Sequence, residues 1–208
     1  MNNGQTPVAT AASTAVDVVF PVSGSTLVRD HAQALQDALS AQWPWLKSEA
    51  QAGIHAIKLV AGTQPQAMLS NRTKLLLRVP MHRAPELLAT SGIELMVAGN
   101  PMNLGAPHTR ELQPHATLYA YHVAAGDTDE AAFMAAVTRE LADMGIGGER
   151  VCGKRQQLLL AGGVLNTFSL MLHALAPEHS LRVQYLGIGP HRLLGCGIFI
   201  PHKSAAAV

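Results

Sequence analysis

The chain has 208 residues, of which 48% are hydrophobic and 14% are charged, and this composition excludes a largely disordered protein. Fifteen Lys and Arg residues against fourteen Asp and Glu give a formal net charge of +1, which taken alone argues against a nucleic-acid partner. The apolar runs fall short of the roughly 18 to 20 residues of a membrane-spanning helix. The N-terminus also lacks the basic start and apolar block of a secretory signal, so we expect a cytoplasmic protein without membrane association.

The first half of the chain predicts alternating strands and helices. Residues 1–15 are small and polar and predict a flexible tail. Residues 16–20 (VDVVF) are typical of a short strand. Residues 27–43 predict a helix, because leucines and alanines recur there at helical spacing before a proline. Further elements are expected as strands over residues 54–60, 67–69, 74–79 and 93–98, and as a short helix over residues 85–90.

The same order of elements begins again after Pro107. The expected elements are a strand over 117–125, a helix over 129–144, two strands about a turn over 150–164, a strand over 167–175, a short helix over 177–186 and a strand over 196–200. Each half is therefore interpreted as β-α-β-β-α-β, the ferredoxin-like or RRM-like unit. The predicted fold class is α+β with tandem ferredoxin-like domains, one over residues 16–108 and one over residues 109–203.

Charge is distributed unevenly along the chain. Residues 127–149 contain six acids and one base, whereas residues 150–208 contain six bases and one acid and are locally +5. This basic segment is a candidate surface for an anionic partner, and the alternative interpretation is an ordinary solvated face. Within it, Lys154 and Arg155 follow a glycine on an expected hairpin and are candidates for binding the phosphates of a nucleic acid.

A glycine loop near the C-terminus is the most specific local signal. Two Gly-x-Gly pairs enclose five residues that include His191 and Arg192; the four glycines are Gly187, Gly189, Gly195 and Gly197. Such a loop can present backbone N–H groups to phosphate, and Arg192 would add a charged fork. The alternative interpretation is a tight connection between a helix and a strand, where glycine only satisfies sterics.

This loop, with a basic residue at its centre, resembles the signature of the RAMP superfamily. Three segments resemble more narrowly the CRISPR repeat-processing endoribonucleases of the Cas-six family, in its myxococcal-type branch: FPVSGSTLVRDHAQALQDALSAQWPWL, GIHAIK and LGCGIFIPHK. The resemblance spans residues 17–203 and implies two ferredoxin-like domains, in agreement with the order of elements. It also implies metal-independent and cofactor-independent cleavage of RNA, in which a 2′-hydroxyl attacks the adjacent phosphate and leaves 2′,3′-cyclic phosphate and 5′-hydroxyl ends.

Two histidines are the candidate catalytic residues, because imidazole titrates near neutral pH. His31 is the first choice, since the family often places a catalytic histidine on or just after the first helix; an N-terminal cap or an exposed histidine is the alternative. His55, in GIHAIK, is the second, with a hydrogen-bonded strand histidine as its alternative. The Tyr–His pair of some branches is missing, and either Lys47 or Lys58 is a candidate for stabilising the phosphate charge.

The resemblance implies CRISPR repeat RNA as the partner, bound through its stem-loop, with other subunits of a CRISPR effector complex as further candidate partners. The RNA-binding candidates are Lys154, Arg155, Gly187, Gly189, His191, Arg192, Gly195 and Gly197. A weaker basic group, Arg72, Lys74 and Arg78, lies on an expected strand and is interpreted as a solvated face. No metal site is expected.

Two alternatives to a nuclease stay open. One is a catalytically silent RNA-binding subunit of the same superfamily, and the other is a ferredoxin-like domain that binds a small molecule or a protein. Cleavage of repeat RNA separates the first alternative from the enzyme. Salt-sensitive binding of hairpin RNA separates an RNA-binding protein from the second alternative, because phosphate contacts weaken as the salt concentration rises.

Overall fold

The first sheet is organised around β1 (Ala15–Ser23), whose residues are buried on both faces. The computed structural model describes residues 15–60, 62–126 and 129–203. β1 is followed by α1 (Ala32–Gln42), β3 (Gly53–Ile54), β5 (Lys74–Pro80), α2 (Ala84–Leu88) and β8 (His108–Glu111). β3 pairs with β5, β5 with β1, and β1 with β8, all antiparallel. The second, third, first and fourth strands of a β-α-β-β-α-β unit therefore lie side by side.

Additional short elements extend this unit. The remaining strands are β2 (Thr26–Val28), β4 (Gln66–Met68), β6 (Ile93–Val97) and β7 (Asn100–Leu104), and the 3-10 helices are η1 (Pro44–Lys47) and η2 (Met81–Arg83). β2 and β4 form a separate two-stranded ribbon. The β6–β7 hairpin pairs with the end of β1 beyond β8.

The second sheet repeats the same arrangement. Its elements in chain order are β9 (Leu118–Ala124), α3 (Glu130–Asp143), β10 (Glu149–Leu160), β11 (Gly163–His173), α4 (Pro177–Leu186), η3 (Arg192–Leu194) and β12 (Ile200–Pro201). The strand order is β10-β11-β9-β12, and every pair is antiparallel. The predicted α+β class with tandem ferredoxin-like units is confirmed.

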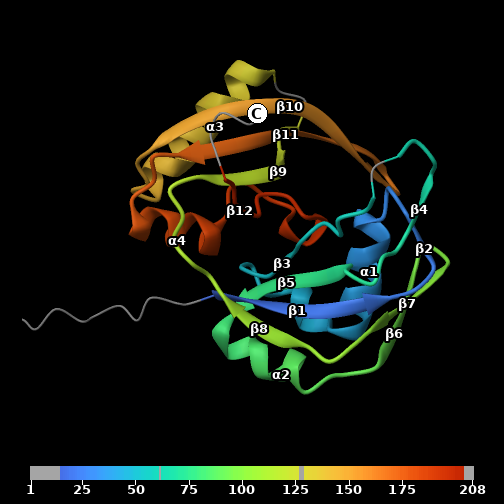
Figure 1. The fold of residues 1–208 in the computed structure, drawn as a ribbon. Coiled ribbons are helices and arrows are strands. Elements are labelled where there is room, and N and C mark those ends of the chain that lie inside the picture. The colour runs from blue at the N-terminus through green and yellow to red at the C-terminus, as the bar shows by residue number, and fades with distance from the viewer. Residues whose placement is uncertain (1–14, 61, 127–128, 204–208) are drawn as a thin grey trace, which may run out of the picture.

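Two hydrophobic cores lie between the sheets and their helices. Alternate residues of β1, among them Val16, Val18 and Phe20, join the core beneath α1, whereas Leu118, Ala120 and Val123 of β9 join the core beneath α3. In Figure 1 the second sheet lies above the first, with α3 on its outer side and α2 below the first sheet. The two sheets consequently turn their other faces toward one another.

Several element boundaries differ from the predictions. The first helix begins at Ala32, because Leu27 belongs to β2 and pairs with β4. The strand expected over 54–60 keeps only Ile54, since Arg29 binds the carbonyl oxygens of Val60 and Gln64 and holds the following segment away from the sheet. The three strands expected over 150–175 are two long strands.

The closing strand is also shorter than expected, because Gly197 has a φ of 66° and a strand cannot pass through that conformation. The predicted tail lies, apart from Ala15, outside the described residues, and the predicted domain boundary after residue 108 stays a prediction. Within the described ranges, no helix has both the length and the apolar character needed to cross a bilayer.

Candidate active site

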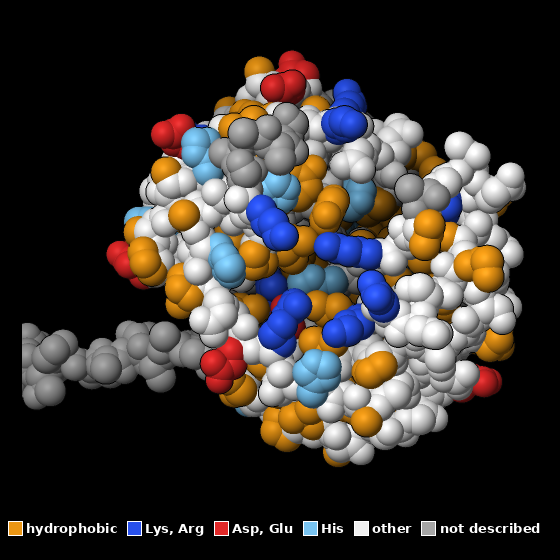
Figure 2. Space-filling model, in the orientation of Figure 1, with side chains coloured by type: hydrophobic (Ala, Val, Ile, Leu, Met, Phe, Trp, Pro, Cys, Tyr) orange, Lys and Arg blue, Asp and Glu red, His pale blue; other side chains and the backbone are white. Residues whose placement is uncertain are grey.

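A basic cleft of about 690 Å³ separates the two sheets. Figure 2 shows Lys and Arg side chains gathered around a hollow in the middle of one face. Its exposed cationic residues are Lys58, Arg72, Lys74 and Arg110, against one exposed acid, Glu111. Lys58, Arg72 and Lys74 form no ion pair with any described residue. The cleft therefore carries uncompensated positive charge that suits a polyanion.

The floor of the cleft is a buried ionic network around Asp17. This carboxylate accepts hydrogen bonds from Arg78 Nε at 2.8 Å and from Arg110 Nη2 at 2.8 Å. Arg78 Nη1 also donates to the carbonyl oxygens of Gln184 and Phe199 in the second unit. Burial alone would raise the pKa of Asp17, but the hydrogen bonds and charges of His55 and Arg78 outweigh it and hold the pKa far below its ordinary value. The network stays ionised and joins the two units.

Arg78 thus corrects one sequence interpretation. The alternation of β5 places it with Lys74 on what was expected to be a solvated face, yet its side chain is only 1% exposed. The face is covered because the second unit lies over it and supplies two carbonyl acceptors, Gln184 O from α4 and Phe199 O from the residue before β12. Arg72 and Lys74, from the same group, line the cleft.

A smaller pocket of about 90 Å³ adjoins the cleft and brings three histidines together. His31 comes from the start of α1, His55 from the residue after β3, and His122 from β9 in the second sheet. We call this cavity the histidine pocket; His55 and Ala56 line both it and the cleft. Among the described residues, no three His, Cys, Asp or Glu side chains are placed to hold one metal ion.

His31 occupies the N-cap position of α1, but its side chain does not cap the helix. Its Nδ1 lies 3.0 Å from the carbonyl oxygen of Val28. Because a carbonyl oxygen only accepts hydrogen bonds, Nδ1 carries the proton and Nε2 has the lone pair of the neutral ring. Burial lowers the pKa of His31, which favours this neutral form. The side chain is buried at the wall of the pocket rather than exposed on the surface.

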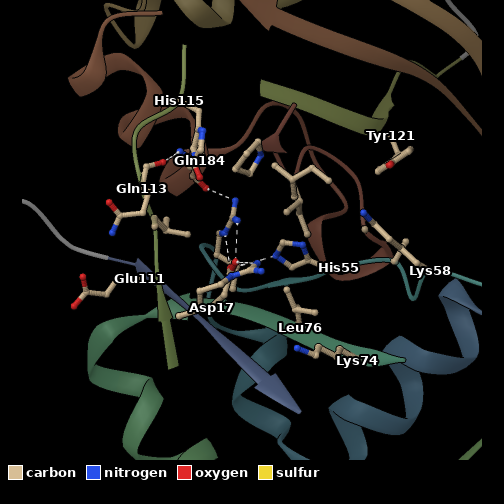
Figure 3. A pocket seen from close by; sticks show the side chains of 18 of the residues that line it. Asp17, His55, Lys58, Lys74, Leu76, Glu111, Gln113, His115, Tyr121 and Gln184 are labelled. Carbon is tan, nitrogen blue, oxygen red and sulfur yellow. Dashed lines mark hydrogen bonds and ion pairs between the residues drawn. The ribbon is translucent and has the colours of Figure 1, made fainter. Parts of the chain in front are cut away.

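His55 is oriented in the opposite sense by Asp17. Its Nε2 lies 3.3 Å from Asp17 Oδ1, so Nε2–H donates to the carboxylate and Nδ1 keeps the lone pair. Figure 3 shows His55 between Asp17 on one side and Lys58 and Tyr121 on the other. Burial lowers the pKa of His55, and the charge of Arg78 acts in the same direction. His31 and His55 are therefore neutral acceptors with fixed tautomers in one pocket.

His122 was missed by the sequence reasoning. It lies within TLYAYHVAA, a segment whose alternation indicates only a strand. Its Nδ1 is 3.0 Å from Thr167 Oγ1, and the Thr167 hydroxyl lies 3.4 Å from the carbonyl oxygen of Gln156. The only signal in the sequence was a histidine among small and apolar strand residues. The other two histidines of the pocket come from the first half of the chain, so the sequence around His122 does not reveal them.

The glycine loop is folded onto the protein itself. The N–H of Gly187 donates to Val183 O, that of Gly195 to Arg192 O, and that of Gly197 to His122 O. The N–H of Gly189 donates to a Glu140 carboxylate oxygen, so it too is paired within the protein. A Cβ at Gly197 would collide with Ile188 O, so glycine is needed for this close approach. The loop acts structurally here, and its expected contact with RNA stays a prediction.

Arg192 is only 7% exposed, and its side chain is hydrogen-bonded within the protein. Its guanidinium donates to the carbonyl oxygens of Leu186, Tyr185 and Gln51. It thereby closes the C-terminal end of α4 and ties the second unit to the segment before β3. The physical reason is that a helix end leaves carbonyl groups unpaired, and a guanidinium can satisfy several of them. His191, beside it, is exposed with a left-handed backbone.

Lys154 and Arg155 are exposed on β10 and line neither the cleft nor the histidine pocket. Arg155 is cross-strand from Phe168, and its guanidinium lies 5.8 Å from the centre of that ring. Because Phe168 faces the core beneath α3, Arg155 lies on the outer face of the sheet, opposite the cleft. Their RNA-binding role stays a prediction, separate from the histidine pocket.

Three comparisons identify relatives of this chain. A protein-family model described as Cas6 Crispr matches residues 16–204. A Myxococcus xanthus protein named CRISPR-associated endonuclease Cas6 is 38% identical over 194 residues, which cover 93% of this chain and 84% of that protein. A solved structure of a CRISPR associated protein Cas6 matches 91% of this chain and 100% of its own, with a TM-score of 0.65 and 7% identity.

A second solved structure, of Thermus thermophilus Cse3 bound to an RNA representing a pre-cleavage complex, has the same arrangement of elements. It covers 90% of this chain and 98% of its own, with a TM-score of 0.51 and 14% identity. At these identities the two structural matches establish a shared fold.

Proposed function

The chain belongs to the Cas6 family, and from this premise we propose that it is an endoribonuclease that cleaves CRISPR repeat RNA in precursor transcripts to release guide RNAs. The observation that carries the proposal is the histidine pocket beside the basic cleft. The cleft holds the RNA backbone, and the pocket receives the scissile phosphate. The name of the Myxococcus xanthus relative, an endonuclease, supports the enzyme over a silent RNA-binding subunit.

The proposed chemistry is attack by a 2′-hydroxyl on the adjacent phosphorus. The 2′-oxygen–phosphorus bond forms while the bond from phosphorus to the 5′-oxygen breaks, giving a 2′,3′-cyclic phosphate and a 5′-hydroxyl. His31 and His55 divide the proton transfers: one removes the 2′-hydroxyl proton, and the other returns a proton to the departing 5′-oxygen. Both start neutral, and the negative phosphate raises the pKa of the ring that must become the acid.

Substrate binding is proposed to rest on the cleft. Lys58, Arg72 and Lys74 form no ion pair with an acid in the described part of the chain, so each can neutralise one phosphate. Tyr121 is exposed in the same cleft, with Lys58 Nζ 5.8 Å from its ring centre, and offers a face on which a base can stack. The product remains bound through the repeat stem-loop and joins other subunits of an effector complex.

The reaction itself is tested with an end-labelled repeat RNA. Wild-type protein in EDTA should cut the RNA at one position, because proton transfer by histidine needs no metal ion. A single 2′-deoxy substitution at the nucleotide before the cut should abolish cleavage, since it removes the attacking hydroxyl. Binding without any cleavage would instead identify a silent RNA-binding subunit, and cleavage of the deoxy substrate would exclude the proposed attack.

The basic cleft gives a separate prediction for RNA affinity. The double change Arg72→Gln with Lys74→Gln should weaken repeat RNA binding and reduce the slope of log K against log salt by about 1.4, at about 0.7 for each lost contact with single-stranded RNA. Arg139→Gln is the matched control, because Arg139 is exposed on α3 and lines neither cavity. Equal salt slopes for the double variant and the wild type, measured by filter binding, would place the RNA elsewhere.

A further inference from the structure

We propose that His122, supplied by the second sheet, is a third catalytic residue of the histidine pocket and donates a hydrogen bond to a nonbridging oxygen of the scissile phosphate. This inference rests on the proposed endoribonuclease function and adds to it. It makes the active site composite: α1 and the β3 end of the first unit supply two histidines, and β9 of the second unit supplies one.

A β-bulge aims His122 into the pocket. Between the pairs Phe168↔Val123 and Leu170↔Ala120, β9 has one residue more than β11. The alternation of β9 is therefore interrupted: Ala120 and Val123 both face the core beneath α3, while Tyr121 lines the cleft and His122 lines the histidine pocket. Bulges occur often beside active sites, where they redirect a side chain. Without the extra residue, His122 and Ala120 would share the core face.

The glycine loop and β10 hold this bulge in place. Gly197 N–H donates to the carbonyl oxygen of His122 at 2.7 Å, and Gln156 Nε2 donates to the carbonyl oxygen of Tyr121 at 2.9 Å. The carbonyl groups of both bulge residues thus accept hydrogen bonds from outside the β9–β11 pair. This places the glycine loop in support of His122.

The hydrogen bonds of His122 leave one nitrogen for a ligand. His122 Nδ1 is hydrogen-bonded to the Thr167 hydroxyl, so Nε2 is the nitrogen left for a ligand. Thr167 is fully buried, which keeps the ring in this orientation. Burial lowers the pKa of His122, whereas a negatively charged phosphate beside Nε2 favours the protonated ring. With the phosphate in place, Nε2–H is a charge-assisted donor, the kind that anionic oxygens bind strongly.

The size of the pocket fits a phosphate group. About 90 Å³ accommodates about three water molecules at about 30 Å³ each, whereas a whole nucleotide needs far more space. The flanking nucleotides therefore lie in the adjoining 690 Å³ cleft, and only the scissile phosphate enters among the histidines. The other titratable or charged residues lining the pocket are Arg29, Asp30, His31 and His55.

Single-turnover cleavage from pH 5 to 9 tests the proposal. His122→Ala should lower the rate about 10²-fold, the cost of removing one donor to a transition-state oxyanion, and should leave repeat RNA affinity within about threefold. His122→Gln keeps an N–H near the position of Nε2 but cannot titrate. Its rate should be about tenfold higher than that of His122→Ala. The wild-type rate should fall at high pH as His122 loses its proton, and the rate of His122→Gln should not show this fall.

His173→Ala is the control, since His173 lies on β11 outside both cavities and should cleave like the wild type. The inference is overturned if His122→Ala cleaves within about threefold of wild type. It is also overturned if the Ala and Gln variants lose rate, affinity and melting temperature together, because that is the signature of a structural role. A wild type that never cuts repeat RNA would instead contradict the proposed function.

Discussion

Replacing His31 by alanine should lower the single-turnover rate of repeat cleavage by about 10²- to 10⁴-fold while repeat RNA stays bound. The ring is buried at the pocket wall, its Nδ1 is held by Val28 O, and its Nε2 is the atom that can exchange a proton with the substrate. The cations proposed to bind phosphate lie in the cleft and are untouched by the change, so affinity should be preserved. Denaturing gels for cleavage and filter binding for affinity measure the two quantities.

A surface histidine provides the control for His31. His82→Ala should cleave at the wild-type rate, because His82 is 67% exposed, forms an ion pair with Glu49 and lines neither the cleft nor the histidine pocket. The pH profile adds a second check, because kcat/KM reports the pKa values of the free enzyme. Burial lowers the pKa of His31, so the fall of kcat/KM toward low pH should have its midpoint below pH 6.5. A His31→Ala variant that cleaves at full rate would exclude this histidine from catalysis.

Asp17→Asn should destabilise the folded protein by about 3 to 5 kcal/mol, the usual cost of leaving a buried charge without its partner. Asp17 and Arg78 are each 1% exposed, and no other described acid forms an ion pair with Arg78. Arg78 also holds two carbonyl oxygens of the second unit, so its displacement weakens the contact between the units. Urea denaturation at pH 7, followed by circular dichroism, measures the change.

The same variant has a distinct dependence on pH. The pKa of folded Asp17 lies far below the value of about 3.9 expected in the unfolded chain. Its stabilisation is therefore complete above about pH 4 and is lost as the pH falls toward the folded pKa. Buried histidines with lowered pKa values also weaken the fold as the pH falls below 6.5. The test is consequently the difference in the free energy of unfolding between wild type and Asp17→Asn. This difference should become smaller below pH 4.

The control for this stability change is Asp37→Asn. Asp37 is exposed on α1 and accepts one hydrogen bond from Gln33, so its loss should change the free energy of unfolding by less than about 0.5 kcal/mol. If Asp17→Asn were as mild as this control, the buried network would not hold the two units together.

Hydrophobic periodicity predicted most of the fold because it is a local property. Leu35 and Leu39 are buried on α1, and Phe133, Val137 and Leu141 form the buried face of α3, as helical spacing indicates. Strand ends were less predictable, because they depend on distant partners. Leu27 fits a helical pattern, yet β4 is available to pair with it, and the segment becomes β2.

The candidate site was only partly visible in the sequence. His31 and His55 were recognised through short segments that resemble the family, and the structure places both in one pocket. His122 was not recognised, because its position depends on a one-residue bulge that shifts the register between β9 and β11. The glycine loop was recognised, but its N–H groups find acceptors within the protein, among them Glu140 from a helix about fifty residues earlier in the chain.

Electrostatics shows most clearly what the sequence determined by itself and what the tertiary structure decided. Near-neutral net charge and the local excess of bases after Arg150 are properties of the sequence, as are the class of fold and the family. The cations of the cleft, however, come mainly from the first unit, while Arg192 is buried and Arg155 faces outward. The physical reason is that periodicity and composition report on neighbours along the chain. A candidate active site between two sheets is instead built from residues far apart in the chain. Arg78, for example, donates to the carbonyl oxygens of Gln184 and Phe199, and these contacts exist only once both units are folded together.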